Sequence, residues 1–161
     1  MNTLVDGSIY EGWFKNNLAI GKGRFINSRD QTVYEGQWKE NQMHGQGKFT
    51  WPDGSTYKGQ FNEDQIHGFG TLKKPDGYIY KGDWVEGVKT GYGKLRQADG
   101  VKYEGEFFNN KRQGYGTQIW PNGKKYVGNW LNGQQNGLGK FIDNTEESKV
   151  GIWEDGQLIK L

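Results

Sequence analysis

Four residues of types that could do chemistry lie within the stretch YEGQWKENQMHGQGKF. Gly45, Gly47 and Lys48 form a Gly-x-Gly-Lys sequence, and a glycine-rich loop of this kind can cradle a phosphate. His44, beside the glycine pair, is a candidate acid, base or metal ligand. Whether these residues form a chemical site depends on the elements that carry them.

The composition indicates an ordered chain whose apolar content is largely aromatic. Of its 161 residues 27 are glycine and only 32% are hydrophobic, which is typical of disorder when aromatic residues are few. Here 15% of the residues are Phe, Trp or Tyr, so we expect order built on aromatic side chains. The length fits a single domain that spans residues 1–161.

The sequence argues against several classes of protein. The amino end, MNTLVDGSIY, lacks the features of a secretion signal, and no apolar run has the roughly 18 residues of a membrane span. Cysteine is absent, which fits a reducing compartment. A net charge of +2 is too small to indicate nucleic-acid binding. We therefore expect a cytoplasmic protein that is not secreted, has no transmembrane segment and binds no nucleic acid.

An internal repeat of 23 residues organises the chain. Each copy begins with a tyrosine, which is followed by Gly at +2, Phe or Trp at +4 and a Gly-x-Gly pair from +11. The first copy is one residue longer, and a partial seventh copy begins at Lys149, where tyrosine is expected. The six repeat tyrosines are Tyr10, Tyr34, Tyr57, Tyr80, Tyr103 and Tyr126.

Each repeat is predicted to be a β-hairpin. Tyr34, Gly36 and Trp38 alternate with polar residues, and the run from Gly45 to Trp51 has the same period of two. We expect the residues ENQM between these runs to form the hairpin loop. The Pro-Asp-Gly triplet after the second run is typical of a turn, which leads into the next hairpin.

The predicted fold class is all-β: an elongated single-layer antiparallel sheet of tandem hairpins, twisted into a trough. The strand glycines lie an even number of residues from the aromatic positions and therefore share their face. Because a glycine leaves room above the backbone, we expect the rings of one repeat to cover the glycines of the next. The expected cross-strand pairs are Glu11–Arg24, Glu35–Lys48 and an uncompensated Lys81–Lys94.

The combination of Tyr-Glu-Gly-x-Trp, Gly-x-Gly and Pro-Asp-Gly at this spacing resembles the MORN repeat family over nearly the whole chain. The resemblance implies an elongated single-layer sheet of hairpins and partners that are often cytoskeletal or ciliary. It also implies links to phospholipids, and to methyltransferase or lipid-kinase domains. Three departures predict weaker packing at the two ends and in the fifth repeat: Lys149, an insertion within 27–31, and Gln118 in a column of Phe and Leu.

The candidate chemical site is better explained as part of the repeat. A phosphate loop requires a helix after its glycines, whereas this Gly-x-Gly lies within a predicted strand and recurs six times. His44 and His67 occupy the same repeat position, and a metal site would need a further ligand beside them. Carboxylates are scattered singly on the outward face. We therefore expect no enzyme activity, no catalytic residue, no metal and no cofactor.

Two surfaces remain as candidates for binding. One is the aromatic face, whose rings either bind a partner or only pack on each other. Its residues are Tyr34, Trp38, Tyr57, Phe61, Tyr80, Trp84, Tyr103, Phe107, Tyr126 and Trp130. The other is a patch on the opposite face, which is either a contact surface or an ordinary solvated one. Its residues are Phe69, Tyr92, Tyr115, Leu138, Lys73, Lys81, Lys94 and Arg96.

We predict a non-catalytic scaffold or adaptor that holds a helical segment of a partner protein along the aromatic groove. Its setting would be a cytoskeletal, ciliary or membrane-proximal assembly. One alternative is a membrane-surface module, in which the basic side chains of the patch bind anionic phospholipid. Another is a protein that regulates an enzyme in trans. The short edge strands expected at both ends also allow end-to-end self-association.

Overall fold

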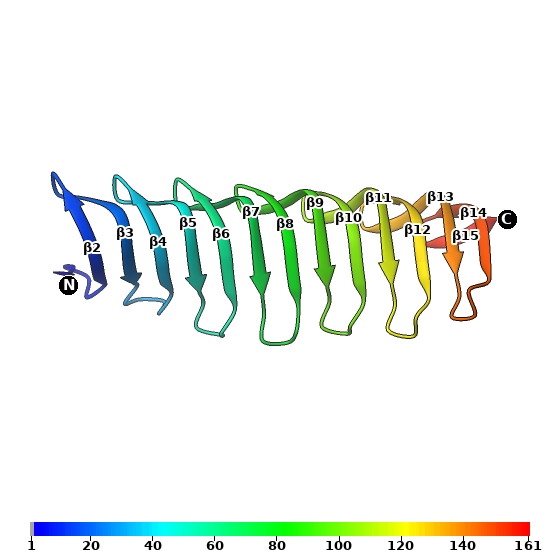
Figure 1. The fold of residues 1–161 in the computed structure, drawn as a ribbon, viewed down its shortest axis with the longest axis horizontal. Helices are drawn as coiled ribbons and strands as arrows, with labels where there is room; N and C mark the ends of the chain where they lie inside the picture. Colours follow the sequence, from blue (N-terminus) through cyan, green and yellow to red (C-terminus); the bar gives the residue numbers. More distant parts are fainter. Residues whose placement is uncertain (1) are drawn as a thin grey trace. The chain divides into compact units, whose positions relative to one another are not determined.

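The computed structural model describes residues 2–161, which form fifteen β-strands. Contacts divide the chain into two compact units, which are described separately. Unit 1 comprises Met1–Pro75 and Trp84–Gly87, and unit 2 comprises Asp76–Asp83 and Val88–Leu161 (Figure 1). Within each unit the strands follow one another through the sheet in chain order and pair antiparallel. The predicted all-β class of tandem hairpins is confirmed.

The strand bounds follow the repeat. Unit 1 holds β1 (Asn2–Thr3), β2 (Ile9–Lys15), β3 (Leu18–Ile26), β4 (Val33–Lys39), β5 (Gln42–Thr50), β6 (Thr56–Asn62) and β7 (Gln65–Lys73). The strand β8 (Ile79–Val85) contributes residues to both units. Unit 2 holds β9 (Val88–Arg96), β10 (Lys102–Phe108), β11 (Lys111–Ile119), β12 (Lys125–Leu131), β13 (Gln134–Ile142), β14 (Ser148–Glu154) and β15 (Gln157–Lys160).

The hairpin loop between β4 and β5 is shorter than the sequence suggested. Only Glu40 and Asn41 lie outside the strands, and their φ angles are 50° and 68°. Two successive residues with positive φ form the type I′ turn that suits the twist of a two-residue hairpin. The expected four-residue loop ENQM is therefore wrong, because Gln42 and Met43 already belong to β5.

The turn that leads to the next hairpin is built as the triplet predicts. The N–H of Gly54 donates to the carbonyl of Trp51 at 3.0 Å, and the N–H of Ser55 donates to the Asp53 carboxylate at 2.7 Å. Gly54 has a φ of 85°, a conformation that glycine adopts without steric cost. The aspartate and glycine of the triplet thus have separate roles, one as hydrogen-bond acceptor and one as the left-handed corner.

A β-bulge lies at each Gly-x-Gly pair. Gly36 is opposite Gly47, but the next partner of Gln37 is His44, so Gly45 and Gln46 are extra residues on β5. Gly45 has a φ of 60°, and the N–H of Gln46 donates to the side-chain oxygen of Gln37 at 2.6 Å. The same bond joins Gln60 to Phe69, Asp83 to Tyr92 and Glu106 to Tyr115. The first glycine of the pair is therefore a bulge residue.

Each repeat tyrosine lies over the glycines of its own hairpin. A Cβ added at Gly36 or Gly47 would come closer than 3.0 Å to the ring of Tyr34. The Tyr34 hydroxyl donates to the carbonyl of Gln37 at 2.8 Å, which fixes the ring in that place. The expectation that a ring covers the glycines of the next repeat is therefore wrong. The tyrosine ring lies over the glycines of its own hairpin, and the next repeat contributes an aromatic ring that packs beside it.

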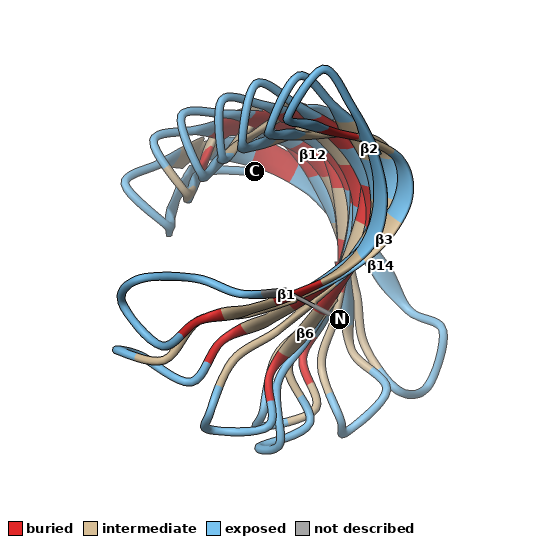
Figure 2. Cartoon of the chain, turned by 90° about the vertical axis from the view of Figure 1, so that its left-hand side faces the viewer, coloured by how far each residue is buried: buried red, intermediate tan, exposed pale blue. Residues whose placement is uncertain are grey.

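Rings of neighbouring repeats meet edge to face. Tyr34 contacts Phe61 with ring centroids 5.0 Å apart, and Tyr103 contacts Trp130 at 5.2 Å. The indoles also donate hydrogen bonds to the preceding hairpin: Trp38 to Gly23 O, Trp84 to Gly70 O and Trp130 to Gly116 O, at 3.1, 3.3 and 3.2 Å. Most buried residues lie within the strands, four others (Ser8, Thr32, Ser55 and Val101) come directly before a strand, and the hairpin loops are mostly exposed (Figure 2).

The departures from the repeat are accommodated locally. Gln118 is buried, and its side-chain oxygen accepts a hydrogen bond from Arg112. The Arg112 guanidinium lies 4.5 Å from the ring centroid of Trp130, so a cation–π contact replaces the missing apolar side chain. The inserted residue lengthens the turn before β4, where Gln31 has a φ of 58°. Lys149, in place of a buried tyrosine, is exposed.

Candidate binding surfaces

The inner face is the sheet face that carries the repeat tyrosines, and its predicted aromatic binding residues are mostly covered. Nine of the ten are buried, with exposed fractions of 4% or less, and Trp38 is half-buried. Tyr57 packs on Trp84 and Tyr80 packs on Phe107, with centroids 5.6 and 5.1 Å apart. The structure therefore brings these rings together as a packed row. Binding by this face stays a prediction, and any partner would meet the residues beside the row.

Such residues line an open groove on the inner face of unit 1, with a volume of about 640 Å³. We call it the inner groove. Phe14 and Leu4 are each 43% exposed, while Trp38 and Met43 are half-buried. Phe14 packs on Tyr10 at 4.9 Å, and Trp38 packs on the same ring at 5.2 Å. The other apolar lining residues are Tyr10, Ala19, Phe25 and Phe49.

The polar lining of the inner groove is acidic. In the part of the chain that the structure describes, residues 2–161, the charged side chains that line it are Asp30 and Asp64, and no lysine or arginine does so. Asp64 accepts the N–H of Met43 at 2.8 Å, and Asp30 accepts both the N–H and the hydroxyl of Thr32. The hydrogen bonds from Thr32 lower the pKa of Asp30, so its carboxylate is charged at neutral pH. Sequence reasoning missed this groove, although the aromatic +4 position of the first repeat pointed to Phe14.

The residues that first suggested chemistry are parts of a strand. His44 and His67 are half-buried on β5 and β7 at equivalent positions. Lys48 lies opposite Glu35 on β4, as expected. Among residues 2–161, no group of three or more His, Cys, Asp or Glu side chains could hold a metal ion. The same residues contain no helix that could cross a membrane.

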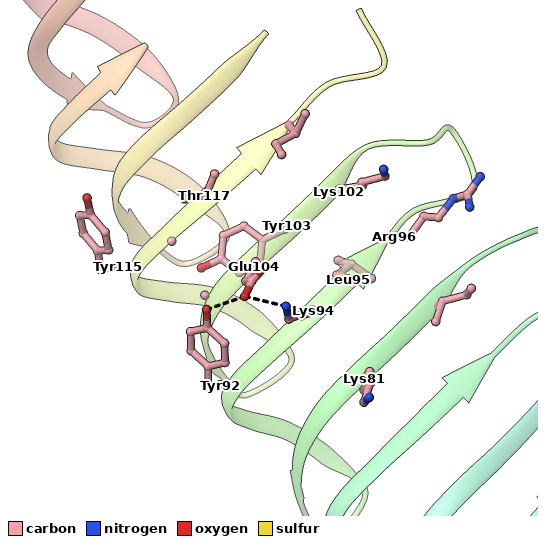
Figure 3. Close-up of a pocket in the computed structure, with 14 residues that line it drawn as sticks. Lys81, Tyr92, Lys94, Leu95, Arg96, Lys102, Tyr103, Glu104, Tyr115 and Thr117 are labelled. Atoms are coloured by element: carbon pink, nitrogen blue, oxygen red, sulfur yellow. Dashed lines mark hydrogen bonds and ion pairs between the residues drawn. The ribbon is translucent and has the colours of Figure 1, made fainter. Parts of the chain in front are cut away.

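The predicted patch lies on the outer face, which is the face opposite the tyrosine row. All eight of its residues are exposed, and the fractions for Phe69, Tyr92, Tyr115 and Leu138 are 50%, 53%, 57% and 57%. In unit 2 the outer face contains an open groove of about 660 Å³, which we call the outer groove (Figure 3). It is lined by Tyr92, Tyr115, Lys81, Lys94 and Arg96 of the patch, and further by Ile79, Lys102, Glu104, Thr117 and Ile119.

One predicted charge pair differs from the structure. Glu104 forms an ion pair with Lys94 at 2.9 Å and accepts the hydroxyl of Tyr92 at 3.0 Å (Figure 3). Lys94 is therefore compensated, and the prediction of an uncompensated lysine pair is wrong. These bonds also lower the pKa of Glu104. On β3, Arg24 lies 3.9 Å from Glu11, as expected.

Arg24 also pairs with Glu35. The Glu35 carboxylate lies 3.1 Å from Arg24, so Glu35, which faces Lys48 on β5 as expected, forms an ion pair across the β3–β4 junction. Both side chains are about half exposed, and exposed pairs of this kind contribute at most about 1 kcal/mol. The outer face thus carries ion pairs that are exposed to solvent.

Tandem hairpins, each closed by a tyrosine ring over paired glycines, define a β-hairpin repeat protein. The family model described as MORN repeat matches residues 34–56, 57–77, 80–102, 103–125 and 126–145. The chain therefore belongs to the MORN repeat family. A comparison with curated proteins found no match.

Two solved structures of Drosophila melanogaster SAS-4 are similar to this chain. Its TCP domain in complex with a proline-rich motif of Ana2 has a TM-score of 0.52 at 12% identity, covering 94% of this chain and 88% of that one. Its TCP10c domain has a TM-score of 0.51 at 11% identity, covering 94% and 89%. At these identities the likeness concerns the fold.

Proposed function

We propose that this chain is a non-catalytic binding module, in which the inner groove of unit 1 holds a helical segment of a partner protein. The observation that carries the proposal is the exposure of Phe14 and Leu4 beside a row of rings that is otherwise covered. Exposed apolar side chains gathered in a groove are typical of a contact surface.

The chemistry of the inner groove favours a basic amphipathic helix. Such a helix, about 10 Å across, presents an apolar stripe at i, i+3, i+4 and i+7. That stripe would pack on Phe14, Trp38 and Met43. Lysine or arginine residues beside it would pair with Asp30 and Asp64, since the charged side chains described in the lining of the groove are both acidic.

The aromatic face has a supporting role in this proposal. Tyr34 is fully buried and packs on Trp38 with ring centroids 5.2 Å apart, so it positions that ring and makes little direct contact itself. Trp38, which is half-buried, is the member of the predicted set that would touch the partner directly. The proposed partner is still a helix, but the residues that would contact it are mainly neighbours of the predicted aromatic set.

The comparisons supply general support for a binding role. The SAS-4 TCP domain, which has a similar fold, is in complex with a proline-rich motif of Ana2. A sheet of this kind can therefore accommodate a segment of another protein. We place the partner among cytoskeletal or ciliary proteins, and a role as partner of an enzyme in trans would use the same groove.

The test compares two adjacent residues on opposite faces of β2. Phe14 lines the inner groove, whereas Trp13, 73% exposed, does not. The probe is a designed basic amphipathic helical peptide, and binding is measured by fluorescence anisotropy. We expect Phe14→Ala to weaken binding about 10-fold or more, which corresponds to about 1.4 kcal/mol, and Trp13→Ala to change it less than about 2-fold.

Two controls make this result decisive. A charge-reversed peptide, with glutamate in place of lysine, is expected to bind at least about 10-fold more weakly because it meets Asp30 and Asp64. A peptide with a central proline cannot form the helix. Equal binding of the proline peptide, or equal loss with Phe14→Ala and Trp13→Ala, would refute the proposal.

A further inference from the structure

We propose that the outer groove of unit 2 is a second binding site, for an acidic, proline-rich segment of a partner protein in the polyproline II conformation. The site uses a different face and different residues from the inner groove. It therefore goes beyond the proposed function, and either site can fail without the other.

The first observation is a row of exposed apolar side chains at one repeat position. Tyr92 on β9, Tyr115 on β11 and Leu138 on β13 are 53%, 57% and 57% exposed. Each follows the first glycine of its Gly-x-Gly pair, so the bulge presents it outward. One strand lies between successive members of the row, so they are two strand spacings apart, or about 9.6 Å at the usual spacing of about 4.8 Å.

This spacing matches the period of a polyproline II helix. That helix has three residues per turn and rises about 3.1 Å per residue, so its period is about 9.3 Å. A segment with proline at every third position, running across the strands, would therefore place one proline ring beside each member of the row. Seven residues of an α-helix advance about 10.5 Å, so a helix would fall out of phase by about 0.9 Å per repeat.

Aromatic side chains are the usual contacts for polyproline II segments, because their flat faces pack on proline rings. Tyr115 has the most exposed ring in the groove and uses only its backbone N–H in binding Glu106. Tyr92 is held in place by its hydroxyl bond to Glu104. The Tyr115 ring can therefore adjust to a bound segment, whereas the Tyr92 ring is already held in position, and little side-chain entropy is lost when Tyr92 binds.

The second observation is the charge of the outer groove. Four of its lining residues are basic, namely Lys81, Lys94, Arg96 and Lys102, and one, Glu104, is acidic. The excess of three positive charges exceeds the net charge of +2 of the whole chain. Lys94 already binds Glu104 at 2.9 Å. Arg96 and Lys102, direct partners on adjacent strands, lie four residues along β9 from Tyr92, about 13 Å at about 3.3 Å per residue. Acidic side chains on that side of the segment would therefore point toward these cations and be attracted by them.

The experiment measures binding of labelled peptides to the full chain by fluorescence anisotropy at low salt. The test peptide has proline at every third position and aspartate or glutamate between. One comparison peptide replaces proline with glycine, and another replaces the acidic residues with lysine. We expect the test peptide to bind at least about 10-fold more tightly than either, since it alone combines a preformed helix with negative charge.

Variants of the chain test the named residues. Tyr115→Ala is expected to weaken binding about 5-fold or more, and the pair Arg96→Glu and Lys102→Glu about 10-fold or more. Leu131→Ala is the matched control, because Leu131 is 45% exposed on β12 but does not line the groove. It is expected to change binding less than about 2-fold, and thermal melting shows whether each variant remains folded.

Three outcomes would overturn the proposal. One is equal binding of the proline and glycine peptides, which would show that only charge is recognised. Another is no effect of Tyr115→Ala in a folded protein. The third is tight binding of vesicles that contain anionic phospholipid, abolished by the Arg96 and Lys102 substitutions, when the test peptide does not compete. That result would assign the groove to a membrane surface instead.

Discussion

Gly70→Ala tests the contact between a repeat tyrosine and the strand glycines of its hairpin. A Cβ at Gly70 would come closer than 3.0 Å to three atoms of Tyr57, and these are the three nearest atoms to it. Gly70 has no positive φ, so alanine fits the backbone, and any loss of stability must come from the ring. Tyr57 is fully buried, so its ring can move only by breaking other contacts.

The magnitude follows from those contacts. The Tyr57 ring meets Phe61 and Trp84 edge to face at 5.2 and 5.6 Å, and its hydroxyl donates to Gln60 O at 3.1 Å. Overpacking costs about 1–3 kcal/mol, an aromatic pair about 0.5–1.5 kcal/mol and a hydrogen bond about 1 kcal/mol. We therefore expect Gly70→Ala to lower the free energy of unfolding by about 3–5 kcal/mol.

The assay is urea unfolding, followed by circular dichroism, with two comparisons. Gly77→Ala is the matched control, because a Cβ there meets nothing within 4 Å and only the φ of 92° is unfavourable. Its cost is expected to be about 1–2 kcal/mol. Tyr57→Leu removes the ring but keeps an apolar side chain, so in that background Gly70→Ala is expected to cost less than about 1 kcal/mol.

The double variant decides between a ring contact and a general effect of alanine. A coupling of about 2 kcal/mol or more between Gly70 and Tyr57 is the expected result. If the two substitutions are additive within about 0.5 kcal/mol, or if Gly70→Ala costs no more than Gly77→Ala, the explanation of the strand glycines is wrong.

Three further predictions concern polar groups of the repeats. Arg112→Ala is expected to lower the free energy of unfolding by about 1–3 kcal/mol, because Gln118 loses its buried partner, while Arg112→Met with Gln118→Phe is neutral or stabilising by urea unfolding. Burial raises the pKa of Tyr57 and of Tyr126 to about 12 from 10.0. The contribution of these neutral tyrosines to the free energy of unfolding is therefore complete below pH 10 and is lost as the pH rises through about 12. Unfolding midpoints measured across this range, with tyrosinate absorbance, check that decline, and a flat profile would contradict it. Arg24→Ala, which removes both of its exposed ion pairs, is expected to cost less than about 1 kcal/mol; a larger loss by thermal melting would show that the pairs form a network.

The sequence was sufficient for the repeat, the hairpins and the turns between hairpins, because each has a local signature. Alternation along β4 and the triplet before Ser55 act within a few residues, where turn chemistry and side-chain direction are fixed by the backbone. Cross-strand partners such as Glu11 and Arg24 also follow directly from the register.

The positions of the rings could not be predicted in the same way. Parity places Tyr34, Gly36 and Gly47 on one face, but it does not say toward which hairpin the ring leans. The bulge also breaks parity at Gly45, so two glycines that look equivalent in sequence have different functions. The inner groove was missed for a related reason, since its exposure depends on how many neighbouring rings cover each aromatic side chain.

Because of the indole hydrogen bonds, junctions between hairpins with and without an additional hydrogen bond alternate along the chain. Trp38, Trp84 and Trp130 each fasten one junction between hairpins to a glycine carbonyl, whereas Phe61 and Phe107 have no donor to offer. Under a pulling force, strands held by backbone bonds and ring contacts alone would separate before those with the additional bond. A tethered chain would therefore extend in unequal steps, and the phenylalanine repeats would act as its compliant segments.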